Sequence, residues 1–181
     1  IEAISAAGFC GVPKDNCHFL EMPFYKTGTV KKMPIGEEDV SLVLDVLLKI
    51  KPDIVFAAGD LSDPHGTHRM CLDAVFRALG LYRKKAGELP SVWLYRGAWQ
   101  EWDPHQIDMA VPISPAESYQ KRHAIFRHES QKDRAMFPGP YDQREFWQRA
   151  EDRNKGTAET YDKLGLPQYH GIEAFVKWDG Q

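Results

Sequence analysis

The stretch at residues 53–69, DIVFAAGDLSDPHGTHR, joins an apolar run to a polar segment that carries two histidines. Residues 53–58 are almost uniformly apolar and partly β-branched, which is typical of a strand covered on both faces in a parallel sheet. The polar segment follows the carboxyl end of this strand, and Thr67 or His68 can begin the next helix. Sites in open parallel sheets form beyond the carboxyl ends of strands, so we expect this segment to line a crevice.

The elements around this strand alternate between helix and strand. An acidic first turn after Gly36 favours a helix that ends before Pro52, and a second helix after His68 runs to about residue 83. A strand at 91–95 then completes a βαβ unit. Further expected elements are the end of a helix at 2–7, a short buried strand at 17–20, a strand at 107–111, a helix from a capping box at Ser114 to about Gln131, a polar helix at 144–164, and an edge strand at 172–178. The sequence therefore predicts an α/β fold, with a three-layer, Rossmann-like, mostly parallel sheet flanked by helices.

Composition narrows the class of protein. The 181 residues and the 43% hydrophobic content predict one globular domain with its own core. The net charge of −3 comes from intermixed signs, which argues against nucleic acid or a membrane surface as a partner. Three cysteines without a C-x-x-C pattern favour neither a disulfide framework nor a thiolate zinc site, so we expect a cytoplasmic protein.

The amino terminus suggests a truncated chain. The first residue is Ile1, and residues 2–7 have the pattern of the last turns of a helix stopped by Gly8. We interpret the chain as a fragment that lacks an upstream part.

The polar segment after residue 58 permits two interpretations. In the first, His65 and His68, with Asp60 and Asp63 nearby, belong to a metal site, since a catalytic zinc needs three protein ligands and a water. In the second, Asp63 caps the following helix and His65 packs in the turn. The spacing alone leaves both open.

Two motifs resemble those of the PIG-L/LmbE-like N-deacetylases. The first is His65-Gly-Thr-His68, where the family usually has H-P-D-H after a strand. The second is Lys121-Arg-His-Ala-Ile-Phe-Arg-His-Glu-Ser-Gln131, which matches the family pattern K-x-x-A-x-x-x-H-x-S-Q. An earlier A-H-P-D-D-E-like segment of the family is absent.

Longer segments resemble one bacterial subfamily, in which a PIG-L-like domain follows an amino-terminal glucosamine-6-phosphate deaminase-like domain. These segments are 57–68, 95–102, 107–112 and 145–153. The resemblance covers nearly the whole chain. It implies that residues 1–181 form a single LmbE-like domain, truncated before the first metal motif.

The resemblance also implies roles for the residues of the first motif. His68 matches the metal-binding histidine, and His65 matches the histidine that stabilises the oxyanion or protonates the leaving amine. Because Gly66-Thr67 replaces Pro-Asp, the carboxylate that orients an imidazole would be Asp63 or Asp60. The expected metal is zinc or another divalent ion, and the missing segment would hold the remaining ligands and the general base. We therefore expect this fragment alone to bind zinc weakly and to be nearly inactive.

Other candidates would bind substrate, and each has a structural alternative. His128, Ser130 and Gln131 would line the pocket as in the family, or simply end a helix. Arg96, in the loop after the 91–95 strand, would hold a phosphate or carboxylate, or form a surface ion pair.

Two aromatic and charged segments complete the candidates. Trp99 and Trp102, beside Glu101 and Asp103, suggest a platform for a sugar ring, or a cover for the sheet edge. The charged run at 151–153 is expected on a solvated helix face.

The leading functional hypothesis is a metal-dependent hydrolase that removes the N-acetyl group from an N-acetylglucosamine-type amino sugar or its derivative, in the intact protein. The alternative is a noncatalytic sugar-binding or assembly domain attached to a glucosamine-6-phosphate deaminase-like domain. The expected partners are the amino-sugar substrate, that amino-terminal domain and a homo-oligomer, with no nucleic acid and no membrane.

Overall fold

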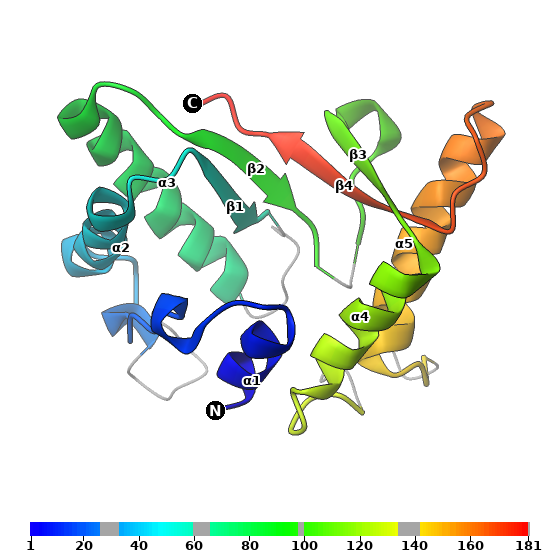
Figure 1. The fold of residues 1–181 in the computed structure, drawn as a ribbon. Coiled ribbons are helices and arrows are strands. Elements are labelled where there is room, and N and C mark those ends of the chain that lie inside the picture. Colours follow the sequence, from blue (N-terminus) through cyan, green and yellow to red (C-terminus); the bar gives the residue numbers. More distant parts are fainter. Residues whose placement is uncertain (26–32, 60–65, 98–99, 134–141, 181) are drawn as a thin grey trace. The chain divides into compact units, whose positions relative to one another are not determined.

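The computed structural model describes residues 1–25, 33–59, 66–97, 100–133 and 142–180. Within these residues a mixed four-stranded sheet has the strand order β1-β2-β4-β3, with helices beside it (Figure 1). The strands are β1 (Ile54–Ala58), β2 (Ser91–Tyr95), β3 (Met109–Ile113) and β4 (Gly171–Lys177), and the α-helices are α1 (Glu2–Phe9), α2 (Glu37–Ile50), α3 (Thr67–Ala86), α4 (Pro115–Phe126) and α5 (Phe146–Lys163). The predicted α/β class is confirmed.

The chain divides into two compact units. Unit 1 contains Ile1–His18 and Ala98–Ala174, and unit 2 contains Phe19–Gly97 and Phe175–Gln181. The prediction that the chain is one LmbE-like domain stays a prediction.

Unit 2 is built on the predicted βαβ unit. Strands β1 and β2 are parallel, with Ile54 opposite Ser91 and Ala58 opposite Tyr95, and α3 connects them. Helices α2 and α3 pack side by side, and α3 packs on β1 (Figure 1). The end of β4 pairs antiparallel with β2. The core includes Leu44, Leu47, Leu72, Ala74, Ala78, Leu79, Val92 and Leu94.

Strand β1 differs from its prediction in one respect. Ile54 and Phe56 are 54% and 55% exposed, whereas Ala57, which follows Phe56, is buried. Strand β1 is an edge strand of the sheet and pairs with β2. Because alternate side chains point to opposite faces of a sheet, Ile54 and Phe56 lie on the same, exposed face. The expectation of two covered faces was therefore wrong for the described residues.

Unit 1 contains the predicted capping box. The Ser114 N–H donates to Glu117 Oε2 at 2.7 Å, and the Glu117 N–H donates to Ser114 Oγ at 3.3 Å. Helix α4 ends at Phe126, before the predicted end near Gln131. The end is earlier because the Arg127 and His128 N–H groups donate to carbonyls three residues back, which tightens the last turn.

Three further expectations need correction. Residues 17–20 form no strand, and their apolar Phe19 is 61% exposed. Strand β4 lies between β2 and β3 in the strand order and not at the sheet edge, and it pairs antiparallel with β2. Helix α1 continues through Gly8 to Phe9.

Within the described part of the chain, none of the helices combines the length and the apolar character needed to cross a membrane. The cytoplasmic location stays a prediction.

Candidate functional site

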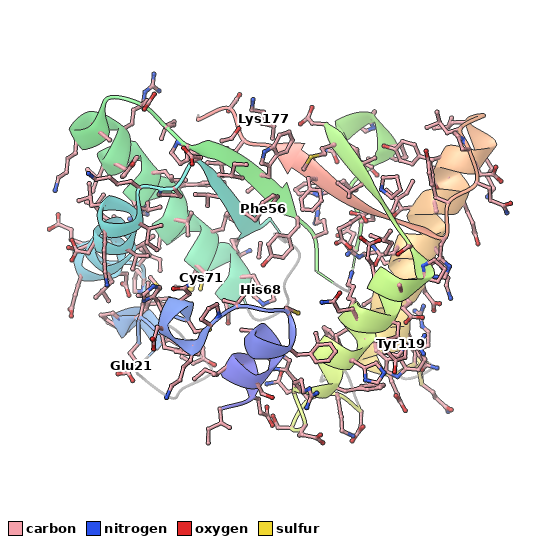
Figure 2. All side chains as sticks on the ribbon, in the orientation of Figure 1. Glu21, Phe56, His68, Cys71, Tyr119 and Lys177 are labelled. Atoms are coloured by element: carbon pink, nitrogen blue, oxygen red, sulfur yellow. The ribbon has the colours of Figure 1, made fainter. Side chains whose placement is uncertain are left out.

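Two predicted site residues follow the carboxyl ends of neighbouring parallel strands in unit 2. Beyond the last register pair of β1 and β2, the Gly59 N–H donates to the Tyr95 carbonyl at 2.7 Å. Arg96 comes directly after this point, and His68 lies exposed in the first turn of α3 (Figure 2). The strand register therefore places Arg96 beside the start of the segment that leads to His68. The candidate catalytic residues Asp63 and His65, and Asp60, lie outside the described residues.

Gly66 gives α3 an unusual start. It is the N-cap of α3 and has φ +68° and ψ 3°, which is the left-handed region that glycine adopts readily. A proline is restricted to φ near −65° and cannot take this conformation. The backbone before His68 thus accounts for one departure from the H-P-D-H pattern.

The described donor groups near His68 are fewer than a catalytic metal ion needs. A catalytic zinc takes three protein ligands. Among the residues that the structure describes, no three His, Cys, Asp or Glu side chains are grouped to hold a metal. The described residues offer His68 as a candidate ligand and do not complete a metal site by themselves.

The candidates of the second motif lie in a turn of unit 1 after α4. The backbone N–H and the hydroxyl of Ser130 donate to the two oxygens of Glu2 at 2.9 and 2.7 Å, and these bonds lower the pKa of Glu2. His128 is half-buried, and Gln131 is exposed. Ser130 therefore ties α1 to this turn, and the predicted substrate contacts of the three residues stay predictions.

Sequence reasoning missed a network of charged and polar side chains in unit 1, which we call the charge network: Glu101, Lys121, Arg153, Asn154 and Glu173. Lys121 Nζ donates to Asn154 Oδ1 and to Glu173 Oε2, both at 2.8 Å. Arg153 donates to Glu173 and, at 3.3 Å, to Glu101 Oε2. Burial lowers the pKa of Lys121, whereas Lys121 and Arg153 hold the pKa of Glu173 below its ordinary value against burial. The sequence pointed to Lys121, Glu101 and the run at 151–153 separately, without indicating that their side chains pair.

The predicted solvated position of the charged run at 151–153 was wrong for Glu151 and Arg153, whereas Asp152 is exposed. Glu151 is 6% exposed and accepts two hydrogen bonds from Arg122, at 2.7 and 2.8 Å. The side chain of Arg153 is 8% exposed. Arg122 of α4 pairs with Glu151, and Glu101 and Glu173 pair with Arg153. Such pairing offsets the cost of removing the charged groups from water.

Part of the predicted sugar platform borders a cavity in unit 1. Glu101 and Trp102 line a cavity of about 230 Å³ together with Thr157 and Tyr161 of α5. Trp99 lies outside the described residues.

Comparisons with known proteins give one close relative in sequence. No family profile matches the chain. Over 180 residues, or 98% of the chain, it is 51% identical to the putative glucosamine-6-phosphate deaminase-like protein of Bacteroides thetaiotaomicron. The chain spans 27% of that protein's length.

A comparison of structures shows a similar fold in an enzyme. The similar structure is the crystal structure of GalB, the 4-carboxy-2-hydroxymuconate hydratase of Pseudomonas putida KT2440. The match covers 97% of this chain and 69% of the GalB chain, with a TM-score of 0.64 and 15% sequence identity. At this identity the likeness concerns the fold. The chain thus shares an α/β fold with this hydratase and has a close relative with a deaminase-like name.

Proposed function

We propose that this chain serves, within a longer protein, as a metal-dependent N-deacetylase domain for an N-acetylglucosamine-type amino sugar. The observation that carries the proposal is the position of Gly59 and Arg96, which directly follow the paired carboxyl ends of the adjacent parallel strands β1 and β2. This is where open α/β sheets form their sites. The 51% identity to a protein with a glucosamine-6-phosphate deaminase-like name supports an amino-sugar substrate.

The chain's own residues would have distinct tasks in amide hydrolysis. His68 would contribute one imidazole to a zinc or other divalent ion, which supplies Lewis-acid activation when it is bound. His65, oriented by Asp63, would donate a proton to the leaving amine. Arg96 would bind an anionic group of the substrate through its guanidinium. The other metal ligands would come from a part of the longer protein outside this chain, as the family resemblance implies.

The test is acetate release by the longer protein, with metal content measured in parallel. His68→Ala should lower both the bound metal and the release of acetate from N-acetylglucosamine derivatives. His170→Ala removes an exposed histidine next to β4 and serves as the matched control, which should leave both unchanged. Unchanged release by His68→Ala would overturn the proposal and would favour the alternative, a noncatalytic sugar-binding or assembly domain for a deaminase-like partner.

A further inference from the structure

A cavity in unit 1 lies between residues 101–107 and one face of α5, and we call it the α5 pocket. Its lining includes Trp102, Ile107, Gly156 and Tyr161, together with charged and hydroxyl groups. We propose that the α5 pocket binds a single ring of an uncharged sugar. This site does not depend on the metal chemistry proposed above.

The size of the α5 pocket limits what it can hold. Its volume of about 230 Å³ is below the range of about 300–1,000 Å³ that is typical of pockets for drug-sized ligands. One hexose ring is a small ligand by this measure. The pocket therefore suits a monosaccharide unit and not an oligosaccharide.

The aromatic lining matches the two kinds of surface that a sugar ring presents. Trp102 and Tyr161 each combine a large apolar ring with a polar group. The C–H groups of a pyranose can pack on such rings while its hydroxyls reach polar partners. Gly156 adds no side chain, and a Cβ built there meets no atom within 4 Å, so the wall of α5 is open at this point.

The carboxylate of Glu101 supplies an oriented acceptor for a hydroxyl. Its Oε1 accepts from the Trp102 N–H at 3.0 Å, and its Oε2 accepts from Thr157 Oγ1 at 3.2 Å and from Arg153 at 3.3 Å. A carboxylate offers about four acceptor positions, so these three bonds leave room for one further donor. Burial raises the pKa of Glu101, which is the signature of a polar group held in an apolar setting.

The charges around the α5 pocket disfavour an anionic ligand. Arg153 is engaged by Glu101 and by Glu173, and the lining residue Asp152 accepts from Arg144 at 2.9 Å. The lining thus holds two carboxylates against one guanidinium that already has carboxylate partners. A sugar phosphate would meet repulsion here, so the geometry selects an uncharged sugar.

The test uses two matched substitutions in helices. Gly156→Leu would fill the α5 pocket, and Gly80→Leu places the same side chain on α3, where a Cβ also meets no atom within 4 Å. Binding of N-acetylglucosamine, methyl glucoside and glucosamine 6-phosphate to the full chain would be measured by saturation-transfer NMR and calorimetry. We expect Gly156→Leu to weaken binding of an uncharged sugar by at least about tenfold and Gly80→Leu to leave it unchanged.

Two outcomes would overturn the proposal. In the first, the two leucine variants bind every uncharged sugar alike. In the second, the binding that Gly156→Leu removes belongs to glucosamine 6-phosphate. His68→Ala should retain the sugar binding, which separates a failure of this proposal from a failure of the deacetylase proposal.

Discussion

Lys121 of α4 donates a hydrogen bond to Glu173 of β4 at 2.8 Å, across 52 residues of sequence. The same ammonium group donates to Asn154 of α5, which in turn donates to Glu173 and to the Ile172 carbonyl. The first residue of the K-x-x-A motif therefore joins two helices and a strand of unit 1. Its role in the described structure is to hold the unit together.

Lys121→Met keeps the apolar stem of the side chain and removes its charge. It should destabilise unit 1, because the Glu173 carboxylate is left with one cation fewer. Removing one partner of a fully buried pair costs about 3–5 kcal/mol. The side chains of Lys121 and Glu173 keep 33% and 20% exposure, so we expect a loss of about 2 kcal/mol in the free energy of unfolding. Urea denaturation measures this loss.

The matched control is Arg77→Met, which breaks an exposed pair with Asp73 at 2.9 Å on α3. Exposed pairs of this kind contribute about 0.3–0.5 kcal/mol. Equal losses for the two variants would show that the Lys121 pair is no more than a surface ion pair.

The βαβ unit could be predicted from the sequence because its signals are local. The bounds of β2 and the start of α3 follow from apolar runs and helix-start residues within a few positions, and the Ser114 capping box spans four residues. The same local patterns indicated that β4 is a strand. They carried no information about its neighbours in the sheet, since strand order depends on pairing between distant segments.

The charge network could not be predicted for a related reason. Arg153 lies on a polar stretch of α5, and its partners Glu101 and Glu173 are 52 and 20 residues away. A helical pattern shows which residues are polar but not whether opposite charges from other elements cover them.

The pH dependence of stability should reveal the buried carboxyl of Glu101. Burial holds the pKa of Glu101 above its ordinary value of 4.5, against the opposing pull of Arg153. Because the folded state then binds the proton more tightly, the stabilising contribution of this group is complete below 4.5 and is lost as the pH rises through the folded pKa. We expect the wild-type chain to lose free energy of unfolding relative to Glu101→Gln as the pH rises from about 4 to about 7.

Glu117→Gln provides a control of opposite sign. Hydrogen bonds from Ser114 lower the pKa of Glu117, so its contribution is present above 4.5 and is lost as the pH falls through the folded pKa. Denaturation curves at several pH values measure both effects. The assignment for Glu101 fails if the difference between the wild type and Glu101→Gln changes with pH in the direction expected for Glu117.

Gly66→Pro tests whether the left-handed N-cap sets the start of α3. Proline cannot adopt φ +68°, so we expect a loss of roughly 2–3 kcal/mol and a displaced first turn around His68. Asparagine tolerates the left-handed region, and the nearest atom to a Cβ at this position is the flexible tip of Arg69, at 3.1 Å. Gly66→Asn should therefore be much milder. Urea denaturation and the NMR shifts of the His68 imidazole measure the two effects, and equal behaviour of the two variants would contradict the role of Gly66.

Gly156→Ala should stabilise the protein, although the glycine borders the α5 pocket. Gly156 is exposed on α5, and a Cβ there meets no atom within 4 Å. Alanine is favoured over glycine in a helix by about 1 kcal/mol, partly because it restricts the unfolded chain, so the melting temperature should rise. Gly165→Ala makes the opposite comparison just after the same helix: φ there is +87°, and a side chain is strained whatever the space around it. We expect calorimetry to show a higher melting temperature for Gly156→Ala and a lower one for Gly165→Ala. A fall in melting temperature for both variants would mean that the face of α5 at Gly156 is covered by another part of the protein.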